Sequence, residues 1–213
     1  MIVYGSTLSP FVRKTLAFAA EKGIAVTLKT VGIGSPDPVF RKSSPFGKMP
    51  GFSDGDFHIS DSTAIITYLD AIQPNPWIIP TEPKARARTI WYEEFADTIL
   101  VASAAKPFFN RIVMPRFMGQ PGDEAAAVTA IEKELPPILA YIEGVLPASG
   151  HLVEDRLTLA DLAVASPFVN LSHAGHEIDA ADYPKLAAFL AAILARPSFA
   201  DMIKSEKAFF APA

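Results

Sequence analysis

The sequence predicts a small α/β domain followed by an all-helical domain. Short strand-like apolar runs alternate with helical stripes over residues 1–75, a proline-rich linker covers 76–83, and only helical periodicity is found over 84–213. With 213 residues, half of them hydrophobic, the chain is long enough to bury a core in each part.

The first elements read as a strand, a helix and a second strand. Residues 1–4 are an apolar run typical of a buried strand. Pro10 suits the first turn of a helix, because its missing N–H costs nothing there, and Gly23 supplies the stop. Residues 25–31 read as the second strand. Since a helix joins the two strands, we expect a parallel βαβ unit.

The rest of the first domain reads as two strands and a helix. A short turn or helix is expected near residues 38–42. Asp54-Gly55 is a strong hairpin signal between the strand-like runs "GFS" and "FHI". Apolar residues then repeat at helical spacing from Asp61 to Ile72. The expected order is therefore βαβ followed by ββα.

The second domain shows helical stripes through residues 84–105, 123–146, 158–170 and 184–195. Pro136-Pro137 lies inside the second stripe, where an interior proline costs roughly 3 kcal/mol. We expect a kink or a restart of the helix there.

The composition narrows the possible functions. The chain has no cysteine, which excludes disulfides, thiolate metal sites and redox chemistry on a thiol of the protein itself. Its net charge of -4 does not favour nucleic acid or an anionic membrane as a partner. No apolar run approaches ~18 residues and no signal peptide is evident, so we expect a cytoplasmic location.

The stretch "STLSPFVRK" follows the first strand and begins the first helix. Ser9 lacks the Gly-x-Ser-x-Gly setting of a hydrolase nucleophile, and no histidine has an evident place beside it. Two interpretations remain open. Ser9 is a helix N-cap, or its hydroxyl also donates a hydrogen bond to an anionic sulfur that arrives with a ligand.

Two further segments carry candidate chemistry. In "GKMPGF", the bond before Pro50 is either an ordinary trans bond or a cis bond that turns the backbone of Met49 outward to pair with a peptide. In "HISDSTA", Asp61 and Ser62 stand at a helix start, where they cap the helix and also offer a site for a carboxylate.

Other signals are weaker. His173 and His176 lack the further ligands of a metal site, so no metal is expected. Thr158 and Asp161 fit a capping box. An aromatic and methionine cluster either fills the core or lines a ligand pocket; it consists of Phe108, Phe109, Met114, Phe117 and Met118.

Five motifs together resemble the glutathione transferases of the serine type (phi, tau and theta), in a bacterial-looking form. They are "LSPFVRK", "SPFGKMP", "DGDFHISDSTAIITYLD", "LTLADLAVASPF" and "YPKLAAFLAAILARPSF", and they span nearly the whole chain in the family's order. The resemblance implies a thioredoxin-like amino-terminal domain, an all-helical carboxy-terminal domain, a homodimer, and glutathione as co-substrate.

The resemblance also implies roles for individual residues. Ser9 looks like the hydroxyl that contacts the glutathione sulfur, with Ser6, Thr7 and Tyr4 as alternatives. The glutathione-binding set carried over from the family is Ser9, Lys48, Met49, Pro50, Asp61 and Ser62. The acceptor site is expected around Phe11, Phe108, Phe109 and Met114.

One departure from the family pattern concerns the loop "GIGSPDP". Many serine-type relatives place a basic residue there, which grips the glycyl carboxylate of glutathione. Here no cation occurs before Arg41 and Lys42. Either the glycyl end is not captured, or Lys48 or Arg41 takes over that role.

The chemistry of such a site can be stated from physical principles. A free thiol has a pKa near 8.5, so only a few per cent is thiolate at neutral pH. Lowering that pKa by about two units needs roughly 2.7 kcal/mol, which one charge-assisted hydrogen bond and a helix N-terminus can supply. We therefore expect a transferase that conjugates glutathione to a hydrophobic electrophile. The alternatives are a glutathione-dependent lyase, dehalogenase, isomerase or peroxidase, or a non-catalytic binding protein on the same scaffold.

Overall fold

The computed structural model describes residues 1–211, which form two compact units. The first comprises Met1–Ile79 together with the segment that starts at Pro197, and the second comprises Pro80–Arg196. The last helix therefore packs with the first unit, although the sequence pattern groups it with the helical stretch 84–213.

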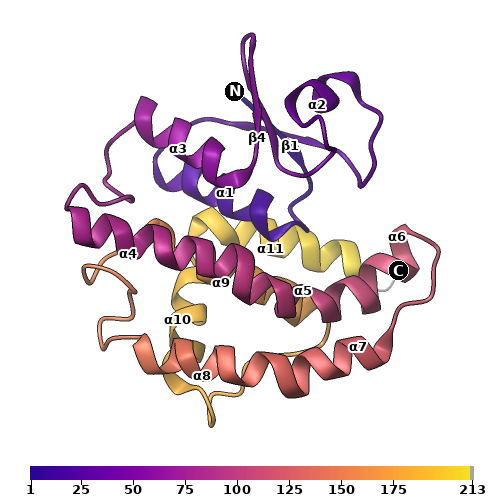
Figure 1. The fold of residues 1–213 in the computed structure, drawn as a ribbon, viewed down its shortest axis with the longest axis vertical. Helices are drawn as coiled ribbons and strands as arrows, with labels where there is room; N and C mark the ends of the chain where they lie inside the picture. The colour runs from indigo at the N-terminus through magenta and orange to yellow at the C-terminus, as the bar shows by residue number, and fades with distance from the viewer. Residues whose placement is uncertain (212–213) are drawn as a thin grey trace. The chain divides into compact units, whose positions relative to one another are not determined.

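The first unit confirms the expected βαβ–ββα order (Figure 1). Its elements are β1 (Ile2–Gly5), α1 (Pro10–Glu21), β2 (Thr27–Thr30), α2 (Pro38–Ser43), β3 (Gly51–Asp54), β4 (Phe57–Ser60), α3 (Ser62–Ile72) and, from the end of the chain, α11 (Pro197–Phe210).

The four strands form one mixed sheet in the order β2-β1-β3-β4. β1 pairs in parallel with β2, whereas β3 is antiparallel to both β1 and β4. Side chains alternate along a strand, so they point to both faces of the sheet, and a helix packs on each face. On one face the ring of Phe52 lies 5.6 Å from that of Tyr68 in α3. On the other, Tyr4 and Val31 form a buried cluster with Phe40 of α2.

Local signals set the ends of α1 as the sequence predicts. Ser9 is the N-cap, and its Oγ accepts a hydrogen bond from the backbone N–H of Val12 at 3.5 Å. At the other end, Gly23 has φ +67°, a left-handed conformation that glycine adopts without steric cost. Its N–H donates to the carbonyl of Ala20 and so ends the helix.

The second unit is all-helical. Its α-helices are α4 (Pro83–Glu94), α5 (Val101–Phe108), α6 (Met114–Phe117), α7 (Glu124–Thr129), α8 (Leu135–Val145), α9 (Leu159–His173) and α10 (Pro184–Leu194). Wider π-helical turns join several of them, at Phe95–Leu100, Phe109–Val113 and Ala130–Glu134.

Prolines explain part of this irregularity. Pro136-Pro137 lies in the first turn of α8, directly after the π-helical turn Ala130–Glu134. A proline has no N–H to donate to the preceding turn, so the regular ladder widens and a new helix begins. The restart expected from the sequence is therefore present.

The central helix α9 begins at the predicted capping box. The Asp161 carboxylate accepts hydrogen bonds from the backbone N–H groups of Thr158 and Leu152, each at 2.8 Å. Burial raises the pKa of Asp161 above its ordinary value, and these two hydrogen bonds act in the opposite direction. The carboxylate thus holds both the helix start and the segment that precedes it.

A buried ion pair attaches the last helix to the first. Arg13 of α1 donates through Nε and Nη2 to the two carboxylate oxygens of Glu206 in α11, at 3.2 and 2.9 Å. Both side chains are almost fully buried. Burial lowers the pKa of Arg13, whereas the charge of Glu206 raises it. Ser198 adds a second contact by donating to Glu21 at 2.6 Å.

Breaking this pair from one side should destabilise the protein. Replacing Arg13 by Met leaves the Glu206 carboxylate buried without its cation, which should lower the free energy of unfolding by about 3–5 kcal/mol. The double variant R13M/E206L removes both charges and should recover most of that loss. Urea denaturation followed by circular dichroism measures both effects, and single variants as stable as the wild type would contradict this role.

Candidate functional site

The register of the sheet gathers three candidate segments at one end. Tyr4 of β1 lies opposite Gly51 of β3, and Gly51 lies opposite Ser60 of β4. The chain leaves β1 toward Ser9, enters β3 from Pro50, and leaves β4 toward α3. The carboxyl end of β1 is also where ligands bind in many α/β sheets.

Ser9 occupies this end of the sheet at the start of α1. Its side-chain oxygen accepts the capping hydrogen bond, and the residue is partly exposed. Since capping uses a lone pair, the hydroxyl proton is left to donate to a ligand. The N-cap and the donor interpretations are therefore compatible.

The sequence suggests Tyr4 as an alternative contact for the glutathione sulfur, but its side chain is buried in the first unit. Its hydroxyl lies 3.1 Å from Oγ of Ser53, and the residue is only 2% exposed. Its ring forms part of the cluster with Phe40 on the α2 face of the sheet.

The Met49–Pro50 peptide bond is cis, the second of the two alternatives that the sequence leaves open. Met49 lies beside the end of β1, because a Cβ atom added to Gly5 would meet Met49 Cβ at 3.5 Å. The same added atom would meet Val12 Cγ2 at 2.5 Å, so Gly5 admits no side chain. The first turn of α1 and the residue before Pro50 therefore meet at Gly5.

Asp61 and Ser62 begin α3, as the sequence predicts. One carboxylate oxygen of Asp61, Oδ1, accepts hydrogen bonds from the backbone N–H groups of Thr63 at 2.9 Å and Ala64 at 3.1 Å. Asp61 is exposed and has φ +82°, a conformation that non-glycine residues rarely adopt. Both capping hydrogen bonds use Oδ1, so the helix cap leaves the second oxygen, Oδ2, unused.

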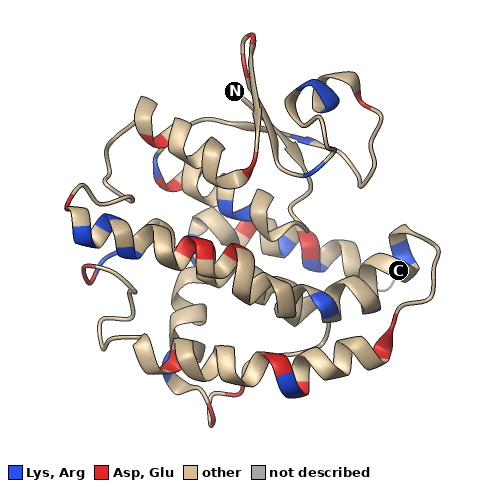
Figure 2. Cartoon of the chain, in the orientation of Figure 1, with Lys and Arg blue, Asp and Glu red and all other residues tan. Residues whose placement is uncertain are grey.

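Exposed cations lie in the last turn of α2 and in the segment between α2 and β3, and Figure 2 shows the positive charge on α2. Arg41 donates from Nε to the carbonyl of Ser35 at 2.9 Å and from Nη2 to that of Gly34 at 3.3 Å. Its Nη1 lies next to Gly47, where an added Cβ would stand 2.7 Å away. Lys48 follows at once and is also exposed. The guanidinium thus lies against the loop that lacks the family's cation.

The residues predicted for an acceptor site differ in exposure. Phe11 belongs to the first unit and is partly buried, whereas the others belong to the second. Phe108 is only 5% exposed, with its ring 6.3 Å from that of His173. Phe109 is 43% exposed and opens a π-helical turn, and Met114 is partly exposed just after it.

Residues 1–211 show neither a metal-binding cluster nor a single membrane-length apolar helix. No three His, Asp or Glu side chains in this range lie together in a way that suits a metal ion. No single helix in this range is both long and apolar enough to cross a membrane; only the broken pair α10 and α11 passes that test of length and composition when taken together.

Two family models match the chain in the order of its two domains. The model for "Glutathione S-transferase, N-terminal domain" matches residues 3–77, and the model for "Glutathione S-transferase, C-terminal domain" matches residues 108–206. The chain belongs to the glutathione S-transferase family. A relative along its whole length is a glutathione S-transferase of Hyoscyamus muticus, 29% identical over 209 residues, with 96% of this chain and 98% of the relative covered.

Solved structures of the family share the fold. A glutathione S-transferase from Rhodospirillum rubrum F11 superposes with a TM-score of 0.86 at 24% identity, covering 94% of this chain and 90% of that one. A theta-class enzyme from Xanthomonas axonopodis pv. citri, solved with glutathione bound, gives a TM-score of 0.81 at 25% identity, with 95% and 96% covered. The thioredoxin-like first domain and the all-helical second domain are those of the glutathione S-transferases.

The sequence does not reveal every contact near this candidate site. Lys29 of β2 pairs with Asp37, the N-cap of α2, with 2.8 Å between Nζ and Oδ2. Asp37 has a visible signal, since it precedes Pro38 at the start of a short helix. Lys29 has none, because only the sheet register brings it next to Tyr4.

Two substitutions of Asp61 should distinguish the contribution of its helix cap to stability from the contribution of its negative charge. Alanine removes the acceptor of two hydrogen bonds and keeps an unfavourable φ, so D61A should lower the free energy of unfolding by about 1–2 kcal/mol. Asparagine keeps an oxygen acceptor, so D61N should stay close to the wild type. Chemical denaturation of the two variants checks this, and equal losses would argue against the capping role.

Proposed function

We propose that the protein is a glutathione transferase, which activates the thiol of bound glutathione and conjugates it to a hydrophobic electrophile. The observation that carries the proposal is the sheet register that brings the segments of Ser9, Met49 and Asp61 to one end of the sheet. Membership of the family and a relative solved with glutathione bound support the choice of ligand.

Ser9 is the residue that we assign to the sulfur. Its hydroxyl donates a hydrogen bond to the thiolate, while its oxygen keeps the cap of α1. The thiolate then lies near the positive end of that helix, which favours the anion further. The thiol proton passes to solvent, the sulfur attacks an electrophilic carbon, and a leaving group such as chloride departs with its electron pair.

The two ends of the peptide are assigned to the other segments. Backbone groups of Met49 pair with the cysteinyl unit, as an added strand would. Oδ2 of Asp61 receives the ammonium of the γ-glutamyl unit, since Oδ1 is already used by the helix cap. The hydroxyl and backbone N–H of Ser62 suit the adjacent carboxylate at this helix start.

The glycyl carboxylate needs a cation that the loop "GIGSPDP" does not provide. Arg41, in the last turn of α2, and Lys48, directly before Met49, are both exposed. Two hydrogen bonds to loop carbonyls fix the Arg41 guanidinium in place. We assign the glycyl end to these two side chains.

We assign the acceptor to apolar side chains of the second unit, namely Phe108, Phe109 and Met114. Phe109 and Met114 are the members of this set in the second unit with appreciable exposed surface. A hydrophobic electrophile gains about 25 cal/mol for each Å² of apolar surface that it buries there. Family membership also supports a homodimer, which light scattering tests.

Removing the Ser9 hydroxyl should raise the pKa of the bound thiol. One charge-assisted hydrogen bond contributes about 1.5–3 kcal/mol, so S9A should raise that pKa by about one to two units and slow conjugation at neutral pH roughly tenfold or more. S9T keeps a hydroxyl and an N-cap and serves as the control. Conjugation of a chloronitrobenzene, followed across pH, measures both, and an undiminished rate in S9A would remove Ser9 from the mechanism.

The assignment of the glycyl end can be tested with an altered ligand. R41Q and K48M should bind glutathione about tenfold more weakly, because an ion pair with the carboxylate is lost. Their affinity for the glycyl monoester of glutathione, which has no charge at that end, should equal that of the wild type. K42M removes a neighbouring exposed lysine and should change neither affinity.

Isothermal titration calorimetry with both ligands provides the measurement. An equal loss for glutathione and for its ester in R41Q or K48M would mean that the residue supports the turn rather than the carboxylate. Wild-type protein that binds no glutathione at millimolar concentration would instead favour the non-catalytic alternative.

A further inference from the structure

Asp37, the N-cap of α2, makes two kinds of contact with one carboxylate. Oδ1 of Asp37 accepts hydrogen bonds from the backbone N–H groups of Val39 at 3.0 Å and Phe40 at 2.9 Å. Oδ2 receives the ammonium of Lys29 at 2.8 Å. The hydrogen bond that Lys29 donates is the main cause that holds the pKa of Asp37 below its ordinary value, and the same hydrogen bond raises the pKa of Lys29.

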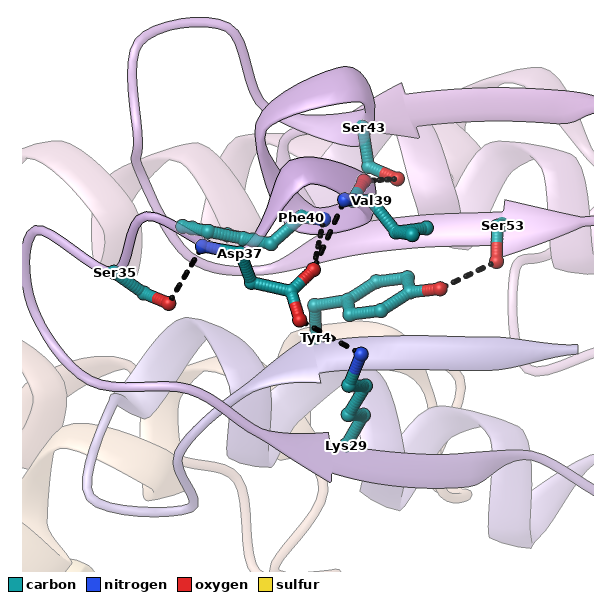
Figure 3. A network of polar contacts seen from close by, with 8 residues as sticks. All are labelled: Tyr4, Lys29, Ser35, Asp37, Val39, Phe40, Ser43 and Ser53. Carbon is teal, nitrogen blue, oxygen red and sulfur yellow. Dashed lines mark hydrogen bonds and ion pairs between the residues drawn. The ribbon is translucent and has the colours of Figure 1, made fainter.

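Lys29 is itself fixed by the sheet. It lies in β2, directly opposite Tyr4 in the parallel register with β1. Its ammonium is 5.6 Å from the centre of the Tyr4 ring, and the Tyr4 hydroxyl is bonded to Ser53 of β3 (Figure 3). A cation over an aromatic ring is attracted by the negative face of the ring. The ion pair therefore connects three strands to the start of α2.

α2 needs such a connection because it is short. It has six residues, and an isolated helix of that length is not stable in water. Phe40 is its fully buried large side chain, packed with Tyr4 and Val31. The carboxyl end of α2 is also held, because Ser43 Oγ lies 2.9 Å from Nδ1 of His58 in β4. The ion pair at the N-cap Asp37 is the contact that holds the opposite end of the helix.

The end of α2 controls the segment that leads to Met49. The N–H of Ser44 donates to the carbonyl of Phe40, and its Oγ donates to the carbonyl of Lys48, each at 2.7 Å. Gly47 packs against the guanidinium of Arg41. A displacement of α2 is thus passed to the backbone between Ser44 and Met49.

We propose that the Lys29–Asp37 ion pair is a positioning device, which holds α2 on the sheet and thereby fixes the Ser44–Met49 turn for glutathione. Neither side chain is assigned a contact with the ligand. The part of this inference that concerns glutathione rests on the proposed function. Lys29 would then affect the affinity for glutathione indirectly, because it contacts the N-cap of α2 while the Ser44–Met49 turn follows the other end of that helix.

Four variants separate the contacts. K29M keeps the aliphatic stem and removes the charge, and D37N keeps an oxygen for the helix cap but loses the ion pair. D37A loses the cap as well. K29R keeps the charge and should rescue the effect of K29M.

The second unit offers a matched control. Lys106 and Glu134 form an ion pair at 2.6 Å whose side chains are 43% and 31% exposed, against 47% and 23% for Lys29 and Asp37. K106M therefore removes an ion pair of similar exposure without touching α2.

Amide hydrogen exchange of residues 41–44 is the first readout. K29M and D37N should each lower protection there by about two- to fivefold, as expected for an exposed ion pair, and D37A should lower it further. K29R and K106M should leave it unchanged. Equal protection in K29M, D37N and the wild type would overturn the anchoring of α2.

Glutathione affinity and turnover are the second readout. The Kd for glutathione should rise in the same order as protection is lost, with D37A the weakest binder. The kcat at saturating glutathione should stay within about twofold of the wild type, because Ser9 caps α1 and not α2. If D37A left the Kd for glutathione unchanged, or lowered kcat by the same factor as it raised Kd, the positioning role would be overturned. If the wild type binds no glutathione, the proposed function fails, and hydrogen exchange alone then decides whether the pair anchors α2.

Discussion

Strand β1 is hydrogen-bonded on both sides, to β2 in parallel and to β3 in antiparallel direction, and the site depends on this double pairing. The pairing sets Tyr4, Gly51 and Ser60 in one row across the sheet. A shift of one residue would turn Tyr4 to the opposite face, because side chains alternate along a strand. It would also separate the start of α1 from Met49. The backbone register, more than any one side chain, brings the candidate residues together.

Helix starts serve the fold and the site with different parts of the same side chain. Ser9 caps α1 with a lone pair and keeps its hydroxyl proton, and Asp61 caps α3 with one oxygen and keeps the other. Asp37 divides its carboxylate between the cap of α2 and Lys29. In each case the side chain that caps the helix N-terminus can form a further hydrogen bond. This explains why capping signals and candidate ligand contacts coincide in this sequence.

Local signals explain which parts of the structure the sequence predicts. The sequence of strands and helices along the first unit, the stop at Gly23 and the caps at Ser9 and Asp61 all follow from residues within a few positions of each other. Local signals do not predict the packing of α11 on α1, because the ion pair between these helices joins residues 193 positions apart. The π-helical turns disturb the helical period and hide helix boundaries in the second domain. Lys29 is missed because its role follows from strand register alone.

The first unit is discontinuous in the chain, and this has a consequence for its biogenesis. A ribosome adds about 5–20 residues each second, so the partner of Arg13 is synthesised roughly 10–40 s after Arg13 itself. During that interval the guanidinium has no Glu206 carboxylate beside it, and the surface of α1 that later receives α11 is uncovered. The helices of the second unit are made before this gap closes. Completion of the nascent amino-terminal unit thus waits until the segment that carries α11 has left the ribosome, well after its own sheet has been synthesised.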